Sequence, residues 1–122
     1  MSIMKENRAR ERRIVNNIVV DACTAEERAM GWYYYIDAKL CFPFRARCIV
    51  RRPISPLKIG DEVKVVAMAP EDECEREMFV AIEWQEDTLS VPLSQLAPIK
   101  AHKATEEAVG DWHYWVEMGY GF

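Results

Sequence analysis

The sequence predicts an α+β protein in which helices pack against a small antiparallel β-unit. Apolar residues recur at helical spacing up to about residue 40, and beyond it they alternate with polar residues, as in strands. The chain has 122 residues, half of them hydrophobic, which suits one domain with one core. We therefore expect one domain over residues 1–122, made of a helical hairpin (1–42), a small β-barrel (43–100) and a C-terminal helix with its tail (101–122).

Two helices form the predicted hairpin. The first is expected over residues 3–22, where one stripe carries Ile14, Val15, Ile18 and Val19. The second is expected over residues 25–40, because Thr24 followed by Glu27 is a capping-box pattern. Pro43 ends this helix, since the residue before a proline avoids the helical conformation. The short link between the helices favours antiparallel packing.

Strands are expected from residue 44 onward. The first is predicted by alternation and has its apolar residues at Phe44, Ala46, Cys48 and Val50. The next three are expected over residues 62–68, 78–84 and 88–91, followed by one helical turn over 93–96. About four or five short antiparallel strands of this size curl into a small barrel or a strongly bent sheet.

The C-terminal segment predicts one more helix. Thr105 is the expected N-cap, and the helix places on one face Ala108, Trp112, Trp115 and Val116. Gly110 weakens the helix, and we expect residues 119–122 to fray.

The composition favours an intracellular protein without a membrane anchor. No run of about 18 apolar residues is present, and residues 1–13 are too polar for a secretory signal. The four cysteines show no Cys-x-x-Cys spacing, so we expect free, buried thiols in a reducing cytoplasm.

The charge is unevenly distributed along the chain. Residues 1–20 carry five Lys/Arg against two Glu, whereas residues 21–122 carry eleven Lys/Arg against eighteen Asp/Glu. The body is therefore expected to repel nucleic acid and to attract cations. Only the N-terminal arm has the opposite sign.

The main candidate for chemistry is the acidic segment, residues 71–77. Five of its seven residues are carboxylates, namely Glu71, Asp72, Glu73, Glu75 and Glu77. Two unit charges about 7 Å apart in water repel by about 0.6 kcal/mol, so such a loop favours a nearby cation. Ca²⁺ suits it because Ca²⁺ accepts six to eight oxygen ligands in irregular geometry. The alternative is a solvated loop that only protects a hairpin.

The acidic segment is not an EF-hand, because Cys74 and Arg76 occupy ligand positions and no glycine follows. A calcium site would therefore gather ligands from separate parts of the fold. Asp37, which follows a run of aromatic residues, is the second candidate, because an aspartate beside aromatics is poorly solvated and needs a partner or a metal. The alternative is a salt bridge to Lys39, Arg45 or Arg47. Asp61 and Glu62 form a third acidic pair that is typical of a turn.

Other functions have less support. His102 and His113 lack nearby cysteines or acids at zinc-ligand spacing, and Cys74 among carboxylates is expected to have a raised pKa. No phosphate-binding loop or nucleophile elbow is present, so we expect no enzyme. Two alternatives remain. One is a protein-interaction module that uses the aromatic residues Trp112, Tyr114 and Trp115. The other is nucleic-acid binding through Arg8, Arg10, Arg12 and Arg13.

Several short motifs resemble those of one known family. They are Asp21-Ala22, Thr24–Arg28, Trp32–Tyr35, Phe42–Phe44, Ser55–Leu57 and Val91–Leu96. In this order and spacing, over roughly residues 10–100, the sequence resembles the small bacterial calcium-binding proteins of the CcbP type.

The resemblance implies helices packed on a small SH3-like barrel, and non-EF-hand Ca²⁺ binding by acidic side chains in a buffering or sensing role. Asp37 matches the family's acidic position after the tyrosines, whereas the acidic segment matches less firmly. The net charge of −4 is modest beside our expectation for the family.

Overall fold

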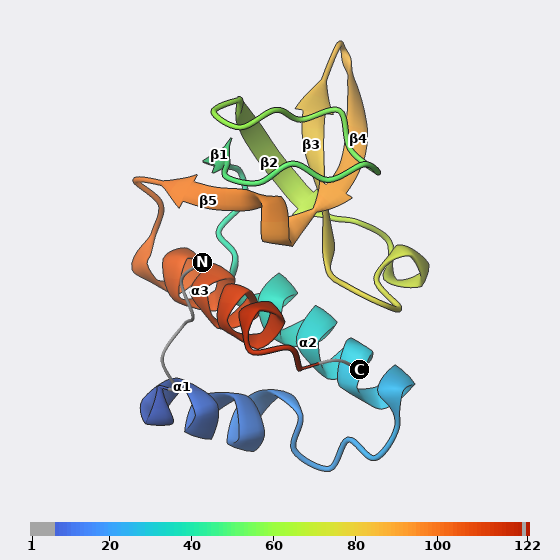
Figure 1. Cartoon of the computed structure of the whole chain (residues 1–122), viewed down its shortest axis with the longest axis vertical. Coiled ribbons are helices and arrows are strands. Elements are labelled where there is room, and N and C mark those ends of the chain that lie inside the picture. Colours follow the sequence, from blue (N-terminus) through green and yellow to red (C-terminus); the bar gives the residue numbers. More distant parts are fainter. Residues whose placement is uncertain (1–6, 121) are drawn as a thin grey trace.

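The computed structural model, which describes residues 7–120 and residue 122, is an α+β fold of two layers. Figure 1 shows the sheet as one layer and the helices as the other. The helical layer contains α1 (Arg8–Arg13), η1 (Ile14–Ile18), α2 (Ala25–Lys39) and α3 (Lys103–Glu117). The sheet contains β1 (Phe44–Cys48), β2 (Glu62–Met68), β3 (Phe79–Trp84), β4 (Asp87–Pro92) and β5 (Leu96–Ile99). Two 3₁₀ turns, η2 (Glu71–Glu73) and η3 (Leu93–Gln95), connect strands.

The two predicted N-terminal helices are present. The first runs over residues 8–18, and its last part, η1, has π-helical geometry; the predicted residues 3–6 lie outside the described part. The second begins after Thr24, whose hydroxyl accepts a hydrogen bond from the Glu27 amide at 3.1 Å. The Thr24 hydroxyl also donates to the Glu27 carboxylate at 3.2 Å. The capping signal therefore places the start of α2 correctly.

The close packing of η1 against α2 depends on Gly31. A Cβ atom at this position would lie 2.3 Å from the carbonyl oxygen of Ile18, which belongs to the backbone. Only glycine therefore permits the two helical segments to approach this closely.

The sheet is antiparallel and open. Its strand order is β4-β3-β2-β1-β5, so β4 and β5 are the two edges, and the expected SH3-like barrel is not confirmed. Alternation in β1 follows the prediction up to Cys48, with Phe44, Ala46 and Cys48 buried and Arg45 and Arg47 exposed, but the predicted Val50 lies beyond the strand and is exposed. A bulge between Val65 and Ala67 shifts the register of β2 against β3. Such a bulge bends the sheet locally.

Strand β5 was not predicted from the sequence. It contains Pro98, which cannot donate to a ladder and therefore argues against a central strand. The structure resolves this because β5 pairs with β1 alone and lies at an edge. Helix α3 partly covers the edge, since the ring nitrogen Nε2 of His113 lies 2.7 Å from the carbonyl oxygen of Leu96.

Two predictions for the C-terminal segment are wrong. Thr105 does not cap α3; the helix begins at Lys103, and the buried Thr105 hydroxyl accepts a hydrogen bond from the Cys41 amide at 2.9 Å. The end of the chain also does not fray over its described part, because the Tyr120 amide donates to the Trp115 carbonyl and its hydroxyl donates to Glu11.

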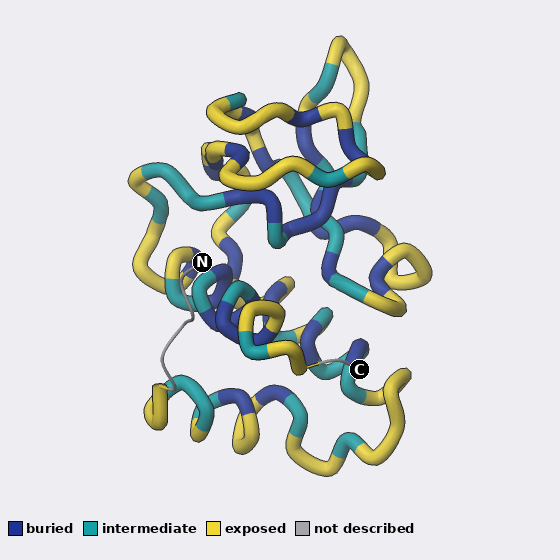
Figure 2. The backbone as a smooth tube through the Cα atoms, in the orientation of Figure 1, coloured by how far each residue is buried: buried dark blue, intermediate teal, exposed yellow. Residues whose placement is uncertain are grey.

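The core lies between the two layers and is rich in aromatic residues (Figure 2). Trp32 of α2 is fully buried and packs at an angle against Trp112 and Trp115 of α3. Trp112, Tyr114 and Trp115 are only 1%, 1% and 9% exposed. The predicted docking surface built from these three aromatics is therefore wrong, because they form the core.

One fully buried carboxylate, Asp111 of α3, joins α3 to α1 and α2. Arg13 donates two hydrogen bonds to it, at 2.9 Å from Nε and 2.6 Å from Nη2, and Arg10 lies 3.4 Å away. The hydroxyl of Tyr35 donates to the same carboxylate at 2.8 Å, and burial followed by this hydrogen bond raises the pKa of Tyr35. Two of the four arginines considered for nucleic-acid binding are thus committed to Asp111.

The position of His113 predicts a dependence of stability on pH. Burial lowers its pKa below the ordinary value of 6.5, although the Leu96 carbonyl and Glu117 act in the opposite direction and Arg10 in the same one. As the pH falls through about 6.5, the unfolded chain binds the proton first, so folding stability declines. We expect the melting temperature to fall between about pH 7 and pH 5.5, and to fall less in His113→Gln. His102→Gln, at an exposed position, is the control. Equal slopes in all three proteins would contradict the prediction.

No helix in the described residues is long and apolar enough to cross a membrane. The cysteines are all free in the structure; Cys48 and Cys74 are buried, whereas Cys23 and Cys41 are exposed.

Candidate metal-binding face

The acidic segment forms the connection between β2 and β3. Its backbone is anchored by Cys74, which is fully buried and whose sulfur accepts a hydrogen bond from the Phe79 amide at 3.3 Å. Met78 is also fully buried. With these apolar side chains turned inward, the segment directs four exposed carboxylates toward solvent, namely Glu71, Asp72, Glu73 and Glu75.

Helix α2 is joined by two tyrosines to the acidic segment and to the residues just before it. The hydroxyl of Tyr33 donates to the Ala69 carbonyl at 2.7 Å, and the hydroxyl of Tyr34 donates to the Glu71 carboxylate at 2.8 Å. Asp37 is exposed and lies one helical turn after Tyr33, on the same side of α2.

Two of the predicted ligands influence the pKa of Tyr33. Burial raises the pKa of this tyrosine, and the negative charges of Asp37 and Glu71 raise it further. The pKa of Tyr34 is raised mainly by its hydrogen bond to Glu71. Both carboxylates therefore act on Tyr33, Asp37 from the same helix and Glu71 from the start of the acidic segment.

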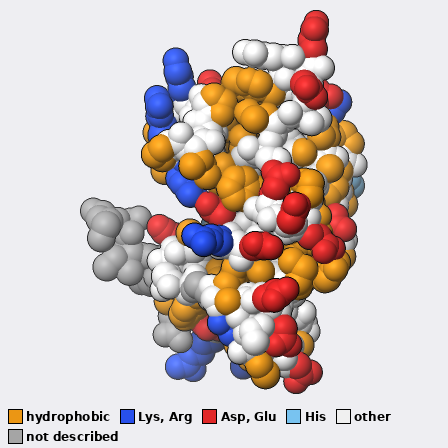
Figure 3. All heavy atoms as spheres, turned by 90° about the vertical axis from the view of Figure 1, so that its right-hand side faces the viewer, with side chains coloured by type: hydrophobic (Ala, Val, Ile, Leu, Met, Phe, Trp, Pro, Cys, Tyr) orange, Lys and Arg blue, Asp and Glu red, His pale blue; other side chains and the backbone are white. Residues whose placement is uncertain are grey.

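A groove runs between α2 and the acidic segment. We call it the acidic groove, and its lining consists of Ala25, Glu26, Ala29, Met30, Glu71, Asp72, Glu75 and Arg76. Arg76 is the single cation against four carboxylates in this lining. Figure 3 looks onto this side of the molecule and shows Asp and Glu side chains gathered across its middle.

Glu77 and Glu73 lie farther along the segment. Glu77 is half-buried and receives two hydrogen bonds from Arg52, at 2.7 and 3.0 Å. Its charge is therefore already compensated, which makes it the least available of the predicted ligands. Glu73 lines an adjoining hollow that shares Asp72, Glu75 and Arg76 with the acidic groove.

The alternative salt bridge for Asp37 is not found among the described residues. Arg45 and Arg47 both pair with Glu62, at 2.5 and 3.0 Å, and the Lys39 ammonium lies over the ring of Tyr35. The expectation that Asp37 is poorly solvated is wrong, because α2 exposes it.

The turn role expected for the third acidic pair is confirmed for Asp61. Its carboxylate accepts a hydrogen bond from the Lys58 amide at 2.9 Å and so closes the turn before β2.

The chemistry of the donor set, a group of exposed carboxylates, suits calcium. In the described part of the chain, no three His, Cys, Asp or Glu side chains are already placed to hold one ion. The carboxylates around the acidic groove are exposed, and Glu71 alone among them accepts a hydrogen bond from Tyr34 in the described residues. Ca²⁺ tolerates such irregular, flexible oxygen ligands, whereas Mg²⁺ demands a near-ideal octahedron.

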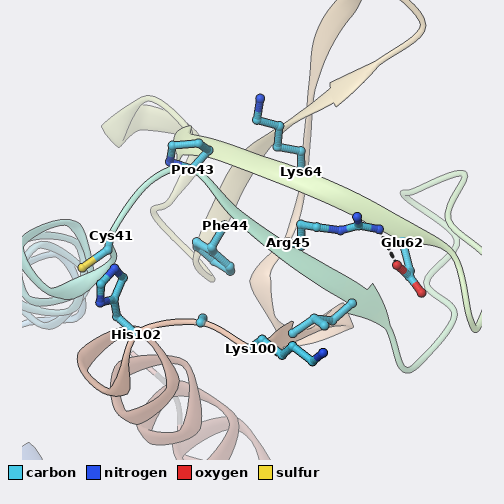
Figure 4. Close-up of a pocket in the computed structure, with 10 residues that line it drawn as sticks. Cys41, Pro43, Phe44, Arg45, Glu62, Lys64, Lys100 and His102 are labelled. Carbon is cyan, nitrogen blue, oxygen red and sulfur yellow. Dashed lines mark hydrogen bonds and ion pairs between the residues drawn. The ribbon is translucent and has the colours of Figure 1, made fainter.

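A second hollow lies between β1 and the segment that leads into α3, and its chemistry differs (Figure 4). Its charged lining residues are Arg45, Lys64, Lys100 and Glu62, which is an unfavourable set for a cation. Figure 4 also places His102 beside Cys41, a proximity that the sequence does not reveal. Two donors are too few for a zinc site, which takes at least three protein ligands.

Sequence reasoning missed two candidates on the metal-binding face, Glu26 and Tyr34. Glu26 lies on the same side of α2 as Met30, which is four residues later, and Asp37, which is seven residues after Met30. Both spacings return to the same helical face. That periodicity is readable in the sequence. The contact of Tyr34 with the acidic segment depends on tertiary packing and has no local signal.

Comparison with known proteins identifies the family and agrees with the fold. The model of a family described as calcium binding, that of the CcbP proteins, matches residues 12–116. The crystal structure of Anabaena CcbP is 39% identical with a TM-score of 0.87, and the match covers 100% of both chains. The structure of a calcium binding protein in its calcium-binding form is 38% identical with a TM-score of 0.86, again over 100% of both chains. No curated protein sequence matches. The chain belongs to the CcbP family of calcium-binding proteins.

Proposed function

We propose that the protein binds Ca²⁺ reversibly on the face between α2 and the acidic segment, through carboxylates, and acts as a calcium buffer or sensor. The observation that carries the proposal is the acidic groove, in which Glu26 of α2 and the carboxylates Glu71, Asp72 and Glu75 of the acidic segment line one hollow. Carboxylates remote in sequence thus share one groove, and the proposal adds Asp37 as a ligand from farther along α2.

Charge supplies the driving force. Glu26, Glu71, Asp72 and Glu75 line one groove with a single arginine. Each pair of carboxylates about 7 Å apart repels by about 0.6 kcal/mol in water, and a divalent ion converts this repulsion into attraction. Exposed ligands must lose side-chain freedom on binding, which limits the affinity.

The exposure of the ligands favours moderate affinity. We expect a dissociation constant of about 10⁻⁶ to 10⁻⁴ M, which is the range of sensors rather than of tight buffers. Such a site loads and empties as the free calcium concentration changes.

Calorimetric titration of the chelator-treated protein tests the proposal. We expect Asp37→Asn and Glu71→Gln each to weaken Ca²⁺ binding by about tenfold, which corresponds to about 1.4 kcal/mol. Saturating Ca²⁺ should raise the melting temperature of the wild type, because the ion binds the folded state.

The matched control is Glu83→Gln, which removes one exposed negative charge from β3, outside the groove. It should bind Ca²⁺ with wild-type affinity. No heat of binding at millimolar Ca²⁺ together with an unchanged melting curve would refute the proposal. Equal weakening in Glu83→Gln would show that only the overall charge attracts the ion.

A further inference from the structure

The loop between β1 and β2 exposes an unusual amount of apolar surface. Nine large hydrophobic side chains are exposed in the described residues, and four of them belong to this loop: Ile49 (47% exposed), Val50 (43%), Ile54 (58%) and Ile59 (67%). Single exposed apolar residues are common, whereas four on one loop favour a contact surface.

The loop is held in one conformation from within. Leu57 is fully buried in the core, and the buried Ser55 hydroxyl accepts a hydrogen bond from its amide at 3.2 Å. Arg52 binds Glu77 with two hydrogen bonds and Ser94 with a third, at 3.2 Å. The isoleucines are therefore presented by a fixed scaffold, which lowers the entropy cost of a contact.

The charge of the loop is opposite to that of the protein. The loop, residues 49–61, contains Arg51, Arg52 and Lys58 against one acid, Asp61, in a chain of net charge −4. Arg52 is satisfied by Glu77, whereas Arg51 and Lys58 are exposed beside the isoleucines. The loop thus offers apolar side chains flanked by two cations.

The acidic groove has the complementary chemistry. Its apolar lining consists of Ala25, Ala29 and Met30, and carboxylates surround it. The loop and the groove lie on the same side of the molecule, because the Arg52–Glu77 pair joins the loop to the acidic segment. On this side, Figure 3 shows hydrophobic side chains above the band of acidic ones.

We propose that, without calcium, two copies of this chain form a two-fold dimer in which the β1–β2 loop of each copy occupies the acidic groove of the other. A two-fold axis between the loop and the groove satisfies both contacts at once and closes the assembly. The loop's two free cations then face carboxylates, and its isoleucines face the apolar lining of the groove.

Calcium opposes this dimer. The regulation rests on the proposed function, because Ca²⁺ would take the same carboxylates that hold the loop of the second copy. Calcium binding and dimer formation therefore compete for the same carboxylates. Ca²⁺ weakens the affinity of one copy for the other, and dimer formation weakens the affinity for Ca²⁺.

Sedimentation velocity over about 5 to 500 μM protein tests the dimer, because weak specific interfaces dissociate within this range. With a chelator at low salt, we expect a concentration-dependent shift from the 14.2 kDa chain toward twice that mass. Saturating Ca²⁺ should return the protein to the monomer. The double variant Ile54→Glu/Lys58→Glu should be monomeric throughout, and its melting curve reports whether it is folded.

The matched control is Lys103→Glu, an exposed position at the start of α3, which should dimerise like the wild type. A wild type that stays monomeric to 500 μM with chelator overturns the proposal, as does a dimer that survives in the double variant. Calorimetry separates the two proposals: absence of Ca²⁺ binding refutes the proposed function and the regulation, whereas a chelator dimer that the double variant abolishes still supports the interface.

Discussion

Replacing Asp111 by alanine is expected to lower the free energy of unfolding by about 3 to 5 kcal/mol, which is the usual effect of breaking a buried ion pair. The carboxylate is 0% exposed and binds Arg13 twice and Tyr35 once. Without it, the Tyr35 hydroxyl and the Arg13 guanidinium lose their shared partner between three helices. For a chain of this size the melting temperature should fall by about 10 to 20 °C, as calorimetry would show.

Glu107→Ala is the matched control for Asp111. Glu107 lies one turn earlier on α3 and approaches the same arginine, but at 3.8 Å and with its side chain 42% exposed. Its loss should cost less than about 1 kcal/mol, as for other exposed ion pairs. Similar losses in the two variants would mean that the buried network contributes no more than a surface contact.

Gly31→Ala is expected to destabilise the protein by about 2 kcal/mol, although alanine usually stabilises a helix interior by about 1 kcal/mol relative to glycine. The new Cβ atom would lie 2.3 Å from the carbonyl oxygen of Ile18, so η1 must move away from α2. Chemical denaturation measures the change.

Gly110→Ala isolates the cause of this loss. It makes the same substitution inside α3, where the new Cβ would meet the flexible guanidinium of Arg10 at 2.6 Å rather than backbone. Because that side chain can turn aside, the cost should be clearly smaller than at Gly31. A Gly31→Ala protein as stable as the wild type would show that η1 is not held closely against α2.

The parts of the fold that follow local rules were predictable. The start of α2 rests on Thr24 and Glu27, which are three residues apart and satisfy each other's groups in the structure. The alternation of β1 required only that one face be buried. These features depend on neighbours in sequence, so sequence was sufficient.

The misplaced elements have causes that are distant in sequence. Thr105 has the right chemistry for a cap, but its hydroxyl serves the Cys41 amide, 64 residues away. Strand β5 contains Pro98, which an edge tolerates and a central strand does not. Whether a strand lies at an edge is a property of the whole sheet. Closure of the sheet into a barrel is likewise a property of the whole sheet. It was expected, and the observed strand order does not show it.

The candidate site divides in the same way. The density of carboxylates over residues 71–77 was evident from the sequence, and the family resemblance drew attention to Asp37. The sequence did not reveal that Tyr34 reaches Glu71, or that Arg52 already compensates Glu77. Both contacts connect segments more than twenty residues apart, and therefore only the packed structure determines which acids stay available.

The two tyrosine contacts have a mechanical consequence. Tyr33 and Tyr34 belong to the helical layer, whereas Ala69 and Glu71 belong to the connection between two strands. A cation bound between α2 and this connection would hold the helical layer against the sheet and slow the transient separation of the two layers. Amide hydrogen exchange in β3 and protease cleavage within residues 70–77 would then report ion occupancy directly, without any label.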